Sequence, residues 1–269
     1  RSGGNLALGG DGEVVEWAVH MRRFDERLTL DHVAASGCLS PPLLAKLVRA
    51  ILASHARAPR RDGAAATASL WRYLRQNEEA FAEFPELFAE EHVARLTKAS
   101  RKRPSDAEPL LIARGRVGHV RRCHGDLHLR NLVLLDGEPT LFDAVEFDDA
   151  VATGDVLYDL AFLLMDFWER GLKGAANLVM NRYLWESDEG HLSGLAALPL
   201  FLSLRAAIRA KVTAAGLPHL AGEARRKAPA DAARYFGCAL EFLEPAVPRI
   251  VAVGGLSGAG KSTLAAALA

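Results

Sequence analysis

Two stretches of the sequence hold residue types that could act on a phosphoryl group. The first reads HGDLHLRN from His124 to Asn131, and Asp143 follows a short distance downstream. Phosphoryl transfer from ATP requires a carboxylate that orients the attacking hydroxyl and accepts its proton, together with oxygen ligands for Mg²⁺. Asp126 could be that carboxylate, and Asn131 with Asp143 could hold the metal. Asp126 and Asn131 have the D-x-x-x-x-N spacing of kinase catalytic loops.

A hairpin is predicted directly after this loop. Two apolar runs, 132–135 and 140–142, are separated by the residues DGEP, and a link that contains Asp-Gly is a strong hairpin signal. The hairpin would return Asp143 to the side of the loop, so that the three polar groups converge. Asp and Asn are also ordinary turn residues, which is the competing interpretation. It is the weaker one, because Asp155 and Asp159 follow in order.

The second stretch is a glycine-rich loop that reads GLSGAGKS and matches the P-loop pattern G-x-x-x-x-G-K-[ST] without a mismatch. Backbone N–H groups and the N-terminus of the following helix would bind phosphate, the lysine would reach the β and γ oxygens, and the last hydroxyl would ligate Mg²⁺. The competing interpretation is a chance glycine-rich loop, but an apolar strand predicted over 250–253 precedes the loop and a helix-forming segment follows it. The predicted nucleotide-binding residues are Gly255, Ser257, Gly258, Gly260, Lys261, Ser262 and Thr263, with Ser262 also a metal ligand.

The elements that must position these residues are mostly helical. Apolar residues recur at i, i+3 and i+4 over several segments, and the first such segment follows an apolar strand predicted over 14–21. A charged, proline-containing stretch over 101–109 predicts a surface connection or a helix start. The predicted helices cover 42–57, 67–81, 85–97, a short segment ending near 114, 156–168, 175–185, 195–215 and 221–243, the last of which Pro229 could interrupt.

Composition excludes several classes of protein. The 269 residues include 33 Lys and Arg against 33 Asp and Glu, and this neutral balance argues against a nucleic-acid partner. Three widely spaced cysteines form no CxxC pair, which favours a reducing cytoplasm over a disulfide framework or a zinc site. No uninterrupted apolar run approaches the roughly 18 residues of a membrane span, and the first residues do not read as a signal peptide.

HGDLHLRN, followed by LFDAVEFDD and GDVLYDLAFLLMD, resembles the aminoglycoside phosphotransferase family, and in particular its bacterial members fused to a P-loop kinase-like domain. The resemblance implies an α+β protein-kinase-like fold over 1–245, with a partial N-lobe and a mostly helical C-lobe. The first strand, P-loop and helix of an α/β P-loop NTPase domain would occupy 249–269. It implies ATP and Mg²⁺ as cofactors, Asp126 as catalytic base, and Asn131 and Asp143 as metal ligands. His124 and Asp159 would support the loop, and the backbone of His20 or Met21 would meet the adenine.

One departure from the family concerns the residues that hold the phosphates. A family member has a strand lysine and a partner glutamate before the adenine-binding hinge, whereas the first lysine here is Lys46. We therefore expect the sequence to be a fragment at both ends.

Three functions fit these observations. The first is ATP-dependent transfer of a phosphoryl group to a hydroxyl of a small molecule such as an amino sugar, an aminoglycoside or a similar polyol. In the second, the P-loop unit is the active kinase or NTPase and the kinase-like part is an accessory. In the third, the kinase-like part senses nucleotide without turnover. The acceptor and the oligomeric state stay open.

Charge is unevenly distributed around the first motif. Residues 95–130 hold ten Lys and Arg against three Asp and Glu, and residues 131–169 hold ten Asp and Glu with no Lys or Arg. An acidic field on one side of the loop would attract a cationic acceptor.

Several further residues have two readings. His119 and His128 are expected at the polar surface rather than on substrate, and Cys123 is expected to pack at a strand end. Met165, Phe162, Phe167 and Trp168 are expected in the core. Core packing is favoured over a substrate cleft for Tyr158 and Trp185, and an acceptor site and a solvated loop are equally open for Glu146, Asp148 and Asp149.

Overall fold

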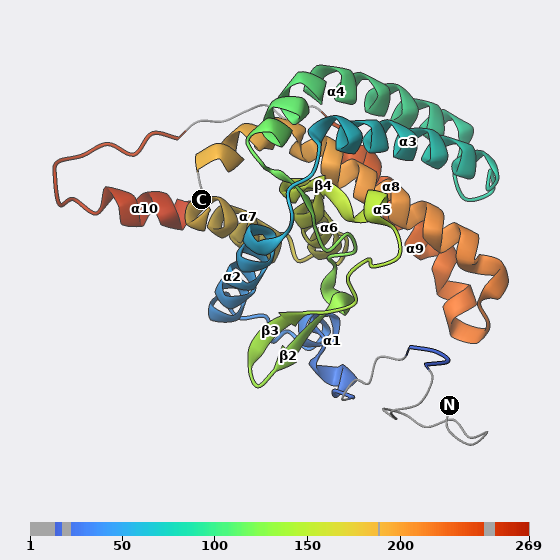
Figure 1. Cartoon of the computed structure of the whole chain (residues 1–269), viewed down its shortest axis with the longest axis horizontal. Helices are drawn as coiled ribbons and strands as arrows, with labels where there is room; N and C mark the ends of the chain where they lie inside the picture. Colours follow the sequence, from blue (N-terminus) through green and yellow to red (C-terminus); the bar gives the residue numbers. More distant parts are fainter. Residues whose placement is uncertain (1–13, 18–22, 188, 245–250, 269) are drawn as a thin grey trace.

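The computed structural model describes residues 14–17, 23–187, 189–244 and 251–268. It is α+β and mostly helical, as predicted (Figure 1). In chain order the longer helices are α2 (Pro41–Arg57), α3 (Gly63–Ala82), α4 (Glu90–Arg116), α6 (Val156–Glu169), α7 (Lys173–Glu186), α8 (Leu198–Gly216), α9 (Gly222–Glu241) and α10 (Lys261–Leu268). Shorter pieces are α1 (Leu30–Ala35), α5 (Asp149–Ala152) and the 3-10 turns η1 (Glu26–Leu28), η2 (Leu129–Asn131), η3 (Glu189–Ala197) and η4 (Leu217–His219).

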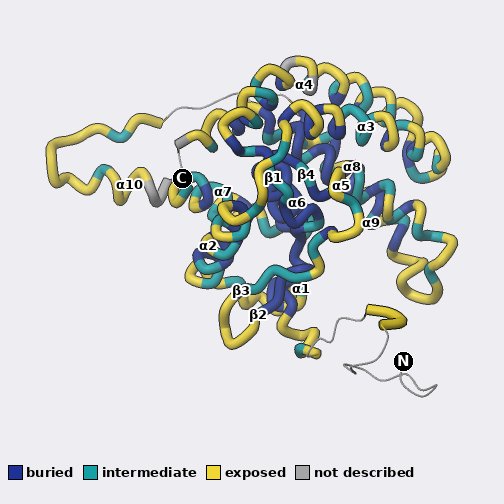
Figure 2. Tube along the Cα trace, in the orientation of Figure 1, coloured by how far each residue is buried: buried dark blue, intermediate teal, exposed yellow. Residues whose placement is uncertain are grey.

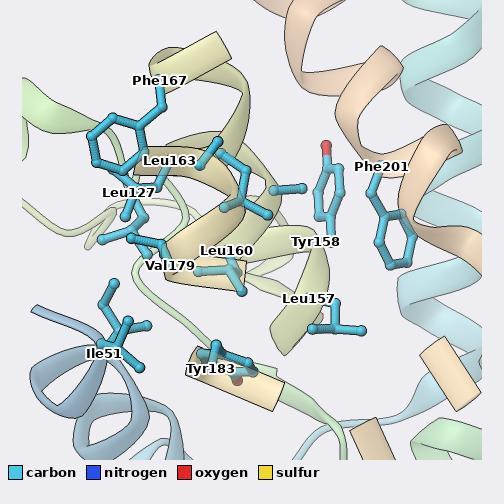
Figure 3. Close-up of a cluster of buried hydrophobic side chains, with 14 of the residues drawn as sticks. Ile51, Leu127, Leu157, Tyr158, Leu160, Leu163, Phe167, Val179, Tyr183 and Phe201 are labelled. Carbon is cyan, nitrogen blue, oxygen red and sulfur yellow. The ribbon is translucent and has the colours of Figure 1, made fainter. Parts of the chain in front are cut away.

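Helix α6 lies at the centre of the helical body and is buried from Val156 to Phe167. It begins at Asp155, whose carboxylate accepts a hydrogen bond from the backbone N–H of Leu157. A helix that is apolar on all sides must be covered on all sides. Helices α2 and α7 pack on one flank and α8 on another, as Figure 3 shows for Ile51, Val179 and Phe201. Figure 2 shows the resulting buried centre and the exposed outer faces.

Helices α3 and α4 form an antiparallel pair whose backbones touch (Figure 1). A Cβ on Gly115 would come 2.5 Å from the Cα of Gly63, so neither position has room for a side chain. This packing corrects the predicted break: α4 runs through Pro104 and Pro109 without interruption, although each proline removes a backbone donor. The residues predicted to begin a helix at 85–89 are turns instead.

Helices α8 and α9 pack against each other, and α9 continues through Pro229 rather than breaking there. By length and composition alone, the segment Gly190–His219 could cross a membrane. In this fold α8 carries nine buried residues and packs on α3, α6 and α9. It therefore has the position of a core helix.

Two short antiparallel sheets frame the first motif. Strands β2 (Leu132–Leu135) and β3 (Glu138–Leu141) form the predicted hairpin, with Leu135 opposite Glu138. Its two turn residues, Asp136 and Gly137, have φ of 52° and 79°. Positive φ at both positions is typical of a type I′ turn, whose twist matches that of the two strands. Strands β1 (Val120–Arg122) and β4 (Thr153–Asp155) pair from Val120 with Asp155 to Arg122 with Thr153. The sequence did not predict this second pair.

Two predicted strands do not appear among the described residues. Residues 14–17 have no regular structure, and the rest of the strand predicted to end at Met21 lies outside the described residues, together with His20 and the adenine contact assigned there. Residues 251–253 before the P-loop are also irregular. A strand is stable only when it pairs with a neighbouring strand, and residues 14–17 and 251–253 have no such partner among the described residues. Apolar character alone is therefore not enough to form a strand.

Candidate active site

The HGDLHLRN loop leaves β1 and is fixed at its start by the β1 and β4 pair. Cys123 N–H donates to the carbonyl of Ala152 at 2.8 Å, and Val145 N–H donates to the carbonyl of His124 at 2.9 Å. Gly125 has φ of 81°, and a Cβ there would press on Val145 and Ala152 at 3.1 to 3.2 Å. Leu127 and Leu129 are fully buried, so the loop backbone is anchored on the core. Figure 3 shows Leu127 among the core side chains.

Asp126 stands at the surface of this anchored loop, with 39% of its side chain exposed. Asn131 Nδ2 donates to Asp126 Oδ2 at 2.9 Å and to the Asp126 carbonyl at 3.0 Å, and His128 Nε2 lies 3.4 Å from the same carboxylate oxygen. Partial burial opposes ionisation, but His128, Arg209 and Asn131 together hold the pKa of the Asp126 carboxyl below its ordinary value. The carboxylate is therefore ionised at neutral pH and open to an incoming group.

The hairpin returns the backbone near Asp143 to the end of the loop. Phe142 N–H donates to the carbonyl of Asn131 at 3.1 Å, which places Asp143 one residue beyond that contact. A carboxylate can only accept, so the Asn131 amide nitrogen must face Asp126 and its Oδ1 is turned away. Asp143 is exposed and has φ of 59°, a left-handed conformation that Asp tolerates better than most residues. An amide oxygen and a carboxylate are ligand types suited to Mg²⁺.

His124 ties the loop to the far end of the hairpin. Its side chain is buried, and Nε2 donates to the carbonyl of Phe142 at 2.9 Å, which makes it the Nε2–H tautomer if neutral. The contact links the residue before Gly125 to the residue before Asp143. It gives His124 the supporting position assigned to it from the sequence.

Asp159 supports the loop from below. It is buried on α6, and its Oδ1 accepts a hydrogen bond from Gly125 N–H at 2.8 Å. Burial opposes ionisation, but the hydrogen bond and charge of His55, with Arg205 and His124, hold the pKa of the Asp159 carboxyl below its ordinary value. Arg205 of α8 donates to the carbonyl of Gly125 at 3.1 Å and to that of Tyr158 at 3.2 Å. The Gly125 residue is thus held through both its N–H and its C=O.

Sequence reasoning missed the partners that come from distant helices. His55 on α2 and Arg205 on α8 both contact Asp159, and Asp166 on α6 accepts a hydrogen bond from Leu129 N–H at 3.0 Å. One feature of the sequence could have indicated these partners. His55 and Arg205 are polar or charged residues at helix positions where the apolar spacing predicts a buried side chain. Which residue each would contact depends on helix packing.

His55, Cys123 and Asp159 place their potential ligand atoms within 4.8 Å of one another. The His55 imidazole and the Asp159 carboxylate are hydrogen-bonded to each other, and burial raises the pKa of the Cys123 thiol well above its ordinary value. The ligand atoms of His55 and Asp159 are already engaged in hydrogen bonds to Tyr183, to each other and to Gly125. The three residues therefore belong to a buried hydrogen-bonded network.

Other expectations have mixed outcomes. Phe162, Met165, Phe167 and Tyr158 are buried and Cys123 packs at a strand end, as predicted, while Trp168 is only partly buried. Trp185 is 85% exposed, so its expected core position is wrong. His128 is buried rather than superficial, because its Nδ1 accepts from Arg130 N–H and caps η2. In the acidic group, Asp149 pairs with Arg122 at 2.6 Å and Asp148 caps α5.

The glycine-rich loop near the end of the sequence leads into a short helix. Gly258 and Gly260 have φ of 81° and 74°, and α10 begins at Lys261. Lys261 Nζ donates to the carbonyl of Leu256 at 2.6 Å across the loop, and Ser262 and Thr263 are exposed in the first turn of the helix. The predicted phosphate-binding residues are thus close in space and accessible.

Comparison with known proteins covers most of the chain. The model of the phosphotransferase enzyme family matches residues 10–194. Uncharacterized proteins of Mycobacterium bovis and Mycobacterium tuberculosis are 29% identical over 265 residues, which are 97% of this chain and 51% of each relative. The chain therefore spans about half the length of these relatives. No solved structure matches it significantly. The family match extends over the HGDLHLRN loop, the hairpin and α6, and the chain belongs to the phosphotransferase enzyme family, which implies a protein-kinase-like fold.

Proposed function

We propose that this chain is an ATP- and Mg²⁺-dependent phosphotransferase that moves the γ-phosphoryl group to a hydroxyl of a small molecule. The observation that carries the proposal is the ionised, accessible Asp126 carboxylate, held by Asn131 beside Asp143. Asn131 Oδ1 and Asp143 would hold the metal, which when bound would neutralise charge on the triphosphate.

Asp126 would orient the acceptor hydroxyl and accept its proton as the bond to phosphorus forms. Asn131 keeps the carboxylate from rotating, because it donates to both the side chain and the backbone of Asp126. The acceptor class we propose is an amino sugar, an aminoglycoside or a similar polyol, and a cationic one is favoured by the exposed acidic residues Asp143 and Glu146. The three cysteines are free, in keeping with a cytoplasmic protein.

The alternative is that the P-loop unit is the active kinase or NTPase and the kinase-like part is an accessory or nucleotide sensor. The left-handed Gly258 and Gly260 and the position of Lys261 across the loop favour a phosphate-binding role for this segment. The matched relatives are about twice as long as this chain, which leaves room in them for a second domain.

Single substitutions separate these proposals. ATP consumption is measured with a panel of amino sugars, aminoglycosides and polyols. Asp126→Asn is expected to lower kcat by a factor on the order of 10² to 10⁴, since it removes the proton acceptor. Asp136→Asn makes the same chemical change at the exposed hairpin turn and should leave kcat unchanged.

Lys261→Ala is the matching variant of the P-loop, with the exposed Lys227→Ala as its control. A loss of turnover in Lys261→Ala alone, with Asp126→Asn at full activity, would reject the leading proposal in favour of the alternative.

A further inference from the structure

A buried chain of hydrogen bonds leads from α7 to the backbone of the catalytic loop. Tyr183 Oη lies 2.8 Å from His55 Nδ1, and His55 Nε2 lies 3.1 Å from Asp159 Oδ2. Asp159 Oδ1 in turn accepts from Gly125 N–H at 2.8 Å. The exposed fractions of Tyr183, His55 and Asp159 are 0%, 5% and 2%. Gly125 directly precedes Asp126, so the chain ends one residue from the proposed base.

The direction of the hydrogen bond between His55 and Asp159 follows from the chemistry of the groups. The ionised Asp159 carboxylate can only accept, so His55 Nε2 carries a proton and donates. The Tyr183 hydroxyl can donate or accept, so it satisfies His55 Nδ1 whether that nitrogen is an acceptor or a donor. The tyrosine therefore holds the imidazole ring in place, and the histidine fixes the Asp159 carboxylate.

Two apolar side chains could fill the space that His55 and Tyr183 occupy between α2 and α7, so packing alone does not explain these polar residues. Burial of an imidazole and a hydroxyl is unfavourable unless both are hydrogen-bonded. Here the hydrogen bonds of both side chains lead to the Asp159 carboxylate. Arg205 approaches from α8 and donates to the Gly125 carbonyl at 3.1 Å. Helices α6 and α8 thus hold Gly125 directly, and α2 and α7 support it through Asp159. The left-handed φ of 81° at Gly125 sets the direction in which Asp126 leaves the core.

We propose that His55 and Tyr183 are positioning residues for Asp126, and that they act through Asp159 and the Gly125 N–H. The role of Asp126 itself rests on the proposed function. A displacement of a reacting group by about 1 Å can lower a rate on the order of 10²-fold, so the loss of one link in this chain is expected to reduce kcat and leave the KM for ATP nearly unchanged.

The test observes Gly125 directly. His124 and Gly125 form the one His-Gly pair in the sequence, so labelling with ¹³C′-histidine and ¹⁵N-glycine yields a single correlated amide signal. In Tyr183→Phe we expect the Gly125 amide to exchange with solvent about tenfold faster than in the unaltered chain. Ser203→Ala is the matched control. It also removes one buried hydroxyl, which donates to the Ala239 carbonyl at 2.7 Å, but it lies outside this hydrogen-bonded chain.

Two variants of His55 separate positioning from packing. His55→Gln retains an N–H donor toward Asp159 and is expected to exchange more slowly at Gly125 than His55→Leu. Phosphate release from Mg-ATP, with water as the acceptor, should fall in the same order. Gly125 exchange in Tyr183→Phe equal to that of Ser203→Ala would overturn the proposal, even if His55→Leu does not fold. Absence of ATP turnover in the unaltered chain would count against the proposed function, and Gly125 exchange would still decide this inference.

Discussion

His191 is a histidine whose surroundings keep it neutral. It lies in η3 against His119, with ring centroids 4.5 Å apart, and against Tyr183 at 5.5 Å. Burial, followed by the positive charges of His119 and Arg114, lowers the pKa of His191 to about 4 from an ordinary value of 6.5. An imidazole that cannot take up a proton in the folded state makes the fold sensitive to acid.

The pH dependence of stability tests this. The unfolded chain takes up a proton at His191 near pH 6.5, before the folded chain does near pH 4. The contribution of His191 is therefore complete above about pH 6.5, falls as the pH is lowered toward about 4, and is constant below that. His191→Asn should flatten the free energy of unfolding across this range in urea titrations. The exposed His92→Asn should keep the slope of the unaltered chain, and an equal slope in both variants would contradict the assignment.

At the scale of elements, the start of α6 is tied to α4 by a buried ion pair. Arg114 Nε and an Nη atom donate to the two oxygens of Asp155 at 2.6 and 2.9 Å, and Arg114 also donates to the carbonyl of Gly190 in η3 at 2.9 Å. Both side chains are almost fully buried. Loss of one partner leaves the other charged and unpaired in the interior.

Arg114→Met is expected to lower the free energy of unfolding by about 3 to 5 kcal/mol. Arg101→Met, which removes an exposed ion pair with Glu78, should cost at most about 1 kcal/mol. In the double variant Arg114→Met, Asp155→Asn, part of the loss should return, because the asparagine can still cap α6 without a buried charge. Chemical denaturation measures the free energy of unfolding of all three variants. Equal losses in the two single variants would show that burial of the Arg114–Asp155 pair does not increase its contribution to stability.

Elements whose signals are local were predictable from the sequence. The apolar spacing of α2 and α6 and the Asp-Gly turn of the hairpin each lie within one element, and each prediction is confirmed to within a few residues. The continuous α4 was not predictable, because packing on α3 through Gly63 and Gly115 outweighs two prolines. The pairing of β1 with β4 joins residues 31 to 35 positions apart, and three residues per strand carry too little pattern to reveal it.

The candidate site divides in the same way. Asp126, Asn131 and Asp143 share one short segment, so their spacing alone indicated that they converge. His55 is 104 residues from Asp159 in sequence, and Tyr183 is 128 residues from His55. Contacts of that separation follow from how α2 and α7 pack on α6, which no local pattern encodes.

At the scale of the whole molecule, many of the acidic side chains in the stretch 131–169 form ion pairs. Asp149, Asp155 and Glu169 pair with arginines from other elements, and Asp166 pairs with Arg170 at the end of its own helix. Asp159 is held by His55 and Arg205. Those that remain exposed near Asp126 in the described chain include Asp143 and Glu146. Any attraction of a cationic acceptor is therefore local to the loop after the hairpin.

Salt dependence of acceptor binding tests this proposal. The KM of a cationic acceptor should rise several-fold between about 0.01 M and 0.3 M salt, because the Debye length falls from about 30 Å to less than 10 Å. Glu146→Gln should weaken that dependence, whereas Glu83→Gln at the distant end of α3 should not. Steady-state kinetics with a cationic and a neutral acceptor provide the comparison, and a KM for the cationic acceptor that does not respond to salt would argue against a cationic acceptor.

The pairing of β1 with β4 has a consequence for how the site assembles. Val120 and Asp155 are partners at its base, and the whole excursion between them contains Asp126, Asn131 and Asp143. The segment is therefore a closed loop whose two ends are held together by the pairing of β1 with β4. Local unfolding of this strand pair would displace Asp126, Asn131 and Asp143 together. At any moment, most molecules should therefore have either a complete site or a fully disrupted one, and few should have a partly formed site.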